Sequence, residues 1–286
     1  MRISASKLIV ALMLVLTLLP MGAQAASLSK KQGQETRRFA YNNSLFVLYH
    51  EVAHLLFDRL SLPILGREED AADNMATWTL LRKRNPQADK VLSDAADGWI
   101  LSGIAYDSGG EESDFYDTHS LDKQRAFQIV CLMVGSDHKA FGPIANEYRL
   151  DGERQDSCAW DYEIVNRSFE GLLGGREHSG GGTRVTVTYH DAGGDLARAA
   201  DAFRSSGVFD QVADELRNNY KLDDEVAFNA QRCGEANAYY DPDTVEVIFC
   251  YELMQDYMDL YAQDLPEIVE PTPGPTGVGK GKNSRF

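Results

Sequence analysis

The string Tyr-His-Glu-Val-Ala-His at residues 49–54 constrains this chain more than any other stretch. It is an HExxH motif inside an apolar run, residues 45–57, whose spacing favours a buried helix. Residues four apart lie on one face of a helix, so His50 and His54 can direct both imidazoles at one metal ion, with Glu51 beside it. The motif therefore predicts a zinc site of the kind that hydrolyses peptide bonds.

A zinc site of this kind needs a third protein ligand and an open fourth position. Glu69 lies fifteen residues after His54, beyond a turn marked by Pro63 and Gly66. Glu69 and Asp73 are four apart on what the pattern predicts as a second helix, residues 68–84. We expect Glu69 to bind the metal and Asp73 to accept a hydrogen bond that orients a ligating imidazole. The alternative ligands, should the helix register differ, are Glu68 and Asp70.

These residues resemble the gluzincins, zinc peptidases in which a Glu on a downstream helix follows HExxH. The Glu69-to-Asp73 spacing is similar to that of neprilysin-like peptidases, and its Glu-x-x-Ala-Asp form also resembles the CAAX prenyl proteases. The whole string 49–73, with Leu-Pro-Ile-Leu-Gly-Arg-Glu-Glu-Asp inside it, resembles a bacterial metallopeptidase family known only as a domain of unknown function. The resemblance implies a zinc-dependent hydrolase with one Zn²⁺ per chain.

The first 25 residues have the features of a secretory signal peptide. Arg2 and Lys7 precede an apolar run, residues 8–19, and the small-residue pattern Ala23-Gln24-Ala25 follows. Cleavage after Ala25 is expected. An uncleaved anchor is the alternative, but the run is short for a membrane span, and no later stretch is apolar enough. The sequence predicts export to the periplasm or medium, without an integral membrane segment after cleavage.

The expected mature chain is strongly acidic. Removing Arg2 and Lys7 leaves 26 basic residues against 44 acidic ones, a net charge of −18. Nucleic-acid binding depends on Lys and Arg that neutralise phosphates, so a nucleic-acid partner is not expected. The predicted partner is a peptide or protein substrate.

The four cysteines of an exported chain predict two disulfides. Three pairings are possible, and local order favours Cys131–Cys158 and Cys233–Cys250. A zinc site made of cysteines is not expected, because none are two to four residues apart.

The remaining patterns predict an α+β protein. Its larger part, residues 26–173, is a helical, zincin-like metal-binding region. A Gly-rich linker, residues 174–182, leads to a smaller α/β part, residues 183–265, and the Pro- and Gly-rich tail, residues 266–286, is expected to be disordered. The expected helices cover residues 37–60, 68–84, 93–106, 121–134, 157–173 and 195–220, and the expected strands cover residues 183–189 and 226–232.

Hydrolysis by a gluzincin also needs a donor to the oxyanion that forms when water attacks the peptide carbonyl. His119 and Arg125 are the candidates, because both flank the start of an expected helix after an acidic loop. His119 can equally be a plain loop residue, and Arg125 can pair with Asp122 or a core carboxylate.

The string Asn237-Ala238-Tyr239-Tyr240 resembles the strand segment with which neprilysin-like and thermolysin-like peptidases hold an extended substrate. The resemblance implies that Asn237 and Ala238 bind substrate, on a hairpin that the Cys233–Cys250 bridge clamps. In those peptidases the strand precedes the HExxH helix, whereas here it follows. This order indicates a circular rearrangement or an accidental likeness, in which case Asn237 simply makes a turn.

Two other interpretations stay open. The chain can be a zinc-binding envelope interaction module without activity, although Glu51 is intact. Alternatively, His50 and His54 are core histidines satisfied by carboxylates, and HExxH is structural. Activity of a Glu51→Gln variant separates the first from a peptidase, and metal content separates the second from both.

Overall fold

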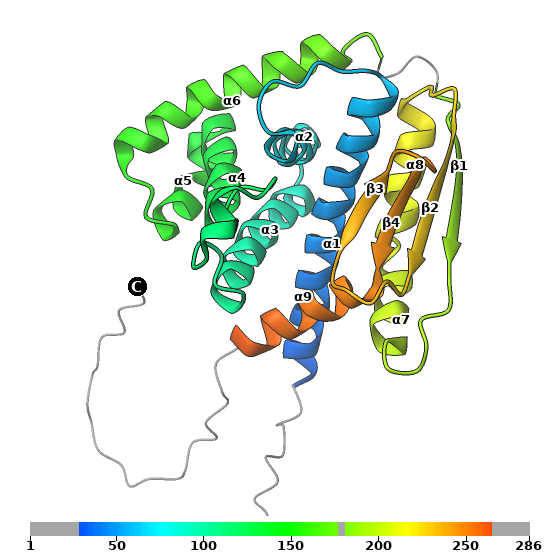
Figure 1. Ribbon diagram of the computed structural model, residues 1–286. Coiled ribbons are helices and arrows are strands. Elements are labelled where there is room, and N and C mark those ends of the chain that lie inside the picture. Colours follow the sequence, from blue (N-terminus) through cyan, green and yellow to red (C-terminus); the bar gives the residue numbers. More distant parts are fainter. Residues whose placement is uncertain (1–28, 177–180, 265–286) are drawn as a thin grey trace, which may run out of the picture.

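The computed structural model describes residues 29–176 and 181–264, so the expected signal peptide, part of the expected linker and the tail lie outside the described residues. Helix α1 (Lys30–Arg59) runs through the middle of the molecule (Figure 1). Helices α2 to α6 lie on one side of it, and a four-stranded sheet with α7 and α8 lies on the other. The HExxH helix is therefore the element that both parts of the chain share.

Helix α1 is longer at its start than its apolar pattern predicts. The Ser29 side chain accepts a hydrogen bond from the backbone N–H of Gln32, and the Gln32 side chain bonds back to Ser29. This capping box satisfies two of the free N–H groups at the helix start and moves it from the expected residue 37 to Lys30. From Phe39 to Phe57 the helix is buried on almost every face, because helices and sheet cover it from both sides.

The remaining helices of the first part pack around α2 (Glu68–Arg82) and α4 (Asp122–Ser136). Helix α3 begins at Pro86 rather than near residue 93 as predicted, since Pro is favoured in the first turn and the Asn85 side chain caps it. The pattern did not predict α5 (His138–Glu147), a short helix capped by Asp137. The other elements are α3 (Pro86–Ala105), the 3₁₀ turn η1 (Glu112–Phe115) and α6 (Gly152–Leu173).

The second part contains one mixed sheet in the order β1-β2-β4-β3. Strands β1 (Arg184–Tyr189), β2 (Glu225–Gln231) and β4 (Glu246–Cys250) are parallel, and β3 (Ala238–Asp241) runs antiparallel to β4 at one edge. The single helix predicted over residues 195–220 is wrong. Gly207, at φ +71°, separates α7 (Ala197–Ser206) from α8 (Val208–Asn219), because that left-handed conformation ends a helix.

Both disulfides form as the local order of the cysteines favours. The Cys131–Cys158 bridge joins α4 to α6, and the Cys233–Cys250 bridge closes the hairpin of β3 and β4. Helix α9 (Tyr251–Asp264) then leaves the sheet and crosses α1. The expected α+β class is confirmed, and in the described ranges no helix is long and apolar enough to cross a membrane. The division into separate regions on either side of residues 174–182 stays a prediction.

Candidate metal centre

Helix α1 places the two histidines of the motif one turn apart on the same face. His50 is almost fully buried and His54 is partly buried. Their Nε2 atoms lie 3.1 Å apart. At this distance two lone pairs, or two N–H groups, would repel each other. The arrangement therefore calls for a proton shared by the two nitrogens or a metal ion bound to both.

Helix α2 adds the third atom. Oε2 of Glu69 lies 3.1 Å from Nε2 of His50 and 3.3 Å from Nε2 of His54. A tetrahedral zinc ion with bonds of 2.0–2.1 Å has its ligand atoms about 3.3 Å apart. The three donor atoms thus have the spacing of one face of such a tetrahedron, and two imidazoles with a carboxylate are a donor set that zinc prefers. The residues fit the metal that the motif predicts.

The other nitrogen of each imidazole is held by a carboxylate of α2. Nδ1 of His50 lies 2.8 Å from Oδ1 of Asp73, and Nδ1 of His54 lies 2.8 Å from Oε1 of Glu68. A carboxylate at Nδ1 accepts a hydrogen bond from the proton on that nitrogen, which leaves Nε2 as the ligating nitrogen. Glu68, considered above only as an alternative ligand, lies where it orients His54 instead. The sequence carried a signal for this, because Glu68 directly precedes Glu69.

Arg125 supports the same arrangement from α4. Its Nε donates to Oδ2 of Asp73 at 2.7 Å and its Nη2 donates to Oδ1 at 2.9 Å. The guanidinium also stacks on Trp99, 3.5 Å from the ring centroid. Both Arg125 and Asp73 are buried, so the pair forms a rigid link from α4 through α2 to the imidazole of His50.

The charges at the site shift the pKa values in opposite directions. Burial alone would raise the pKa of Asp73, but Arg125 and His50 lower it well below its usual range. Burial would likewise raise the pKa of Glu69, and hydrogen bonds from His119, His50 and His54 lower it instead. Burial would lower the pKa of His50, but Asp73 and Glu69 raise it to about 9. Without a metal, the site therefore retains protons on its imidazoles that a cation would replace.

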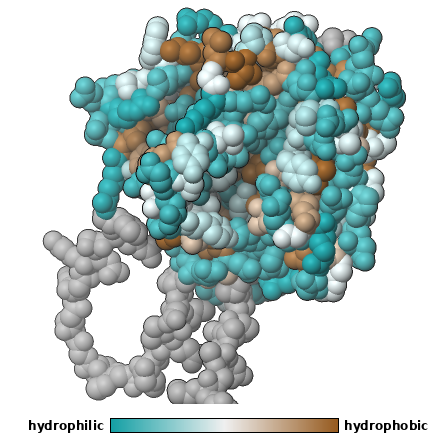
Figure 2. Space-filling model, in the orientation of Figure 1, coloured by the Kyte–Doolittle hydropathy of each residue, from teal (hydrophilic) through white to brown (hydrophobic). Residues whose placement is uncertain are grey.

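Glu51 follows His50 in α1, and its carboxyl group accepts a hydrogen bond from strand β3. Burial raises the pKa of its carboxyl group, against the lowering effects of His50, His54 and a hydrogen bond from the backbone N–H of Tyr240 in β3. Glu51 lines a cavity of about 440 Å³ between α1, α3, α9 and the start of β3. Figure 2 shows the molecule from the side seen in Figure 1; this surface is hydrophilic over much of its area and hollowed near its centre.

The predicted oxyanion donors both reach this cavity. Nε2 of His119 lies 3.0 Å from Oε2 of Glu69, and its Nδ1 lies 3.1 Å from Asp117. Nη1 of Arg67 donates to the backbone oxygen of His119 at 2.9 Å and holds this loop against the start of α2. Arg125 also lines the cavity, but two of its nitrogens are already bonded to Asp73.

Asn237 and Ala238 line the cavity together with His50 and Glu51, although they are nearly two hundred residues away in the sequence. Strand β3 brings them there because it is the edge of the sheet that packs against α1. The Asn237 side chain accepts a hydrogen bond from the backbone N–H of Ala238 at 2.9 Å.

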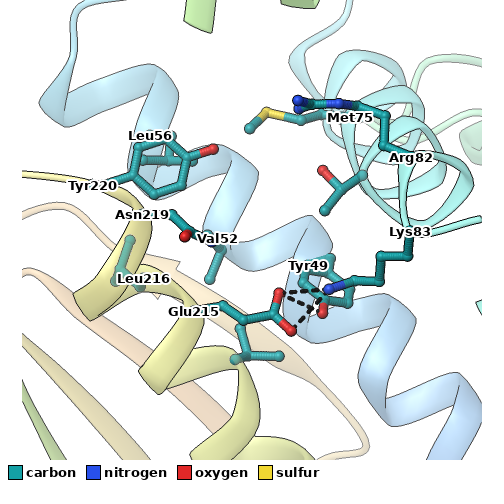
Figure 3. A pocket seen from close by; sticks show the side chains of 12 residues that line it. Tyr49, Val52, Leu56, Met75, Arg82, Lys83, Glu215, Leu216, Asn219 and Tyr220 are labelled. Atoms are coloured by element: carbon teal, nitrogen blue, oxygen red, sulfur yellow. Dashed lines mark hydrogen bonds and ion pairs between the residues drawn. The ribbon is translucent and has the colours of Figure 1, made fainter. Parts of the chain in front are cut away.

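A second cavity, of about 210 Å³, lies on the opposite face of α1, between α1, α2 and α8 (Figure 3). Glu215 of α8 accepts hydrogen bonds from Nζ of Lys83 and from the hydroxyl of Tyr49, each at 2.8 Å. None of the residues that line this cavity is shared with the metal centre. The three side chains attach α8 to the back of the HExxH helix.

A further group of possible metal donors, Cys131, Cys158 and Asp161, lies elsewhere in the helical part. Both sulfur atoms are in a disulfide, so they lack the thiolate that binds metal. Among the described residues, the group of His50, His54 and Glu69 remains as the candidate metal centre.

Comparison with known proteins indicates a metal-dependent peptidase. A sequence family described as "Putative metallopeptidase" matches residues 11–173 and 189–270, which is most of the chain. No curated protein and no solved structure matches the chain.

Proposed function

Because the chain belongs to this metallopeptidase family, we propose that it is an exported zinc-dependent peptidase of the gluzincin type. The observation that carries the proposal is the group of three donor atoms, His50 Nε2, His54 Nε2 and Glu69 Oε2, 3.1–3.3 Å apart with Glu51 beside them. Export agrees with the two disulfides, since disulfides persist in oxidising compartments.

In this proposal His50, His54 and Glu69 hold one zinc ion per chain. A bound zinc ion supplies Lewis acidity, which polarises the substrate carbonyl and makes water a better nucleophile at neutral pH. Asp73 and Glu68 keep the imidazoles in the ligating tautomer, and Arg125 keeps Asp73 ionised. The protein groups therefore fix the ligands before the metal binds.

Glu51 is the proposed general base. It takes a proton from the attacking water and passes it to the nitrogen of the leaving amine. Its position next to His50 on the wall of the cavity places its carboxylate beside the donor atoms without making it one of them. Burial raises its pKa, and a raised pKa brings a carboxylate closer to the value that suits a base at neutral pH.

His119 is the proposed donor to the oxyanion. Its imidazole reaches Glu69 from the cavity side, and the neighbouring Glu69 and Asp117 raise its pKa, which favours the protonated, donating form. Arg125 stays the second candidate, because it also lines the cavity.

The outward edge of β3 at Ala238 is the proposed support for the substrate main chain. The backbone N–H of Cys250 donates to the backbone oxygen of Asn237 at 3.0 Å, so the backbone groups of Asn237 and Tyr239 point towards β4. In an antiparallel pair the alternate residues point the other way, so the N–H and C=O groups of Ala238 and Tyr240 point outward. The Tyr240 N–H donates to Glu51, and Ala238 lies two residues before it, which supports a substrate strand close to the proposed general base. An extended peptide can add to this edge as a strand.

The test of this function is a Glu51→Gln variant beside the wild type, both loaded with zinc and incubated with a peptide mixture that is read by mass spectrometry. The variant should bind zinc as the wild type does and lose peptide cleavage by at least a hundred-fold, because general-base catalysis contributes about 10²–10⁴. Full activity in the variant would remove Glu51 from the mechanism. A wild type that binds zinc but cleaves nothing would favour the inactive envelope module.

A further inference from the structure

The cavity beside Glu51 extends well past the metal centre and changes character along its length. Its inner end carries His50, Glu51 and the Ala238 edge, whereas its outer end lies between α3 and α9. The cavity is also lined by six apolar or aromatic side chains, beside the polar Asn43 and Ser102: Phe46, Val47, Trp99, Leu253, Tyr257 and Leu260. A side chain that enters beside the scissile bond would thus meet apolar groups.

At the outer end the cavity wall includes a carboxylate, Asp256 of α9. Asp256 is partly buried, and the Tyr106 hydroxyl donates a hydrogen bond to its Oδ1. Across the part of the chain that the structure describes, no Lys, Arg or His side chain pairs with it. Burial, with repulsion from Asp259, raises the pKa of Asp256. A carboxylate taken partly out of water without a cation is costly, and a cationic ligand would relieve that cost.

The cationic groups of the cavity cannot supply this partner, because each is held by another carboxylate. Arg125 bonds to Asp73, His50 lies between Asp73 and Glu69, and His119 lies between Glu69 and Asp117. The outer end therefore keeps an uncompensated negative charge.

The surface around the cavity mouth is also acidic. A neighbouring hollow shares Tyr106, His119 and Arg125 with the cavity, and its wall adds Asp114, Asp117 and Asp122. Charges of one sign around a cleft attract ligands of the opposite sign. Tyr106 lies 61 % exposed at this rim, so its side chain can move aside without loss of core packing.

We infer that this cavity takes a lysine or arginine side chain of the peptide substrate, with its aliphatic stem against Val47, Trp99 and Leu253 and its cationic end on Asp256. Long basic side chains combine an apolar stem with a charged tip. The cavity offers apolar side chains for the stem and the carboxylate of Asp256 for the tip. The inference rests on the proposed peptidase function, and it makes cleavage beside basic residues the specificity of this site.

The first arm of the test measures binding without turnover. The zinc-loaded protein is titrated with n-butylguanidinium and with the uncharged isostere n-butylurea, and binding is followed by ligand-observed NMR. Wild type should prefer the guanidinium by at least ten-fold, since a desolvated charge pair discriminates strongly. Asp256→Asn, which preserves shape and the bond to Tyr106, should reduce the preference below three-fold. The control Asp259→Asn, on the exposed face of the same helix, should preserve it.

The second arm reads the cleavage sites of a peptide library. Wild type should show Lys and Arg enriched at one position next to the cleaved bond, and only Asp256→Asn should lose this enrichment, by at least ten-fold. Equal binding of the two probes, or an unchanged preference in Asp256→Asn, would overturn the inference. Cleavage with no basic preference would overturn it too and leave the peptidase function intact. Absence of any cleavage would refute the peptidase function, and the probe titration would then decide the cavity by itself.

Discussion

Replacing Arg125 by Met tests whether the Arg125–Asp73 ion pair supports the candidate metal centre. Arg125 is 7 % exposed and Asp73 is 4 % exposed, and two hydrogen bonds of 2.7 and 2.9 Å join them. Met fills a similar volume but leaves Asp73 as a buried carboxylate with only His50 as a partner. Removing one member of a buried ion pair costs about 3–5 kcal/mol of unfolding free energy. We expect a loss in this range for Arg125→Met.

The effect should depend on pH in a defined direction. The folded protein lowers the pKa of Asp73, so the pair stabilises fully above the unfolded value of about 4 and contributes less as the pH falls below it. The loss in Arg125→Met should therefore be complete at pH 7 and shrink in acid.

The assay is urea unfolding of the zinc-free protein at pH 7 and at pH 3, below the unfolded pKa of Asp73. Lys123→Met, on an exposed position of the same helix, is the control and should change stability by less than about 0.5 kcal/mol. The double variant Asp73→Asn with Arg125→Met should lose much less than the sum of the two single losses, because both remove one interaction. Additive losses, or a loss under about 1 kcal/mol for Arg125→Met, would refute the view that this pair supports the site.

Three more predictions concern the surroundings of the site. The pKa of His50 is raised to about 9 without metal, so zinc affinity should rise as the pH increases towards 9. In the zinc-free protein, the contribution of His50 to stability should be complete below about 6.5 and be lost as the pH rises to about 9. Calorimetry in buffers of different ionisation heat should also detect proton release on zinc binding. Glu68→Gln should weaken zinc binding about 10–100-fold, measured by competition with a chelator, since His54 loses the carboxylate that orients it. Glu215→Ala should cost about 1–3 kcal/mol in urea unfolding, because Tyr49 and Lys83 lose their acceptor, and should leave peptide cleavage unchanged.

The site residues differ in how far the sequence alone could place them. His50, His54, Glu69 and Asp73 come together through local spacing, four residues apart on two helices joined by a short turn. Helical periodicity is enough to place such residues relative to one another. The disulfide partners also followed from their order in the chain.

Contacts between distant elements could not be predicted in the same way. The Arg125–Asp73 pair joins α4 to α2, and the outer cavity forms only where α9 approaches α3. No periodicity in the sequence encodes these pairings. The errors in helix limits have local causes: Asn85 and Pro86 start α3 early, and Gly207 divides a continuous apolar pattern into α7 and α8.

The most direct test of the proposed metal centre is the zinc content of the purified protein, measured by elemental analysis for wild type, Glu69→Ala and Asp70→Ala. Asp70 neighbours Glu69 on α2 but does not belong to the group of three donor atoms. We expect about one zinc per chain in wild type and in Asp70→Ala, with zinc lost or strongly weakened in Glu69→Ala. No zinc in any of the three after reconstitution, or loss in Asp70→Ala with retention in Glu69→Ala, would contradict the proposed metal centre.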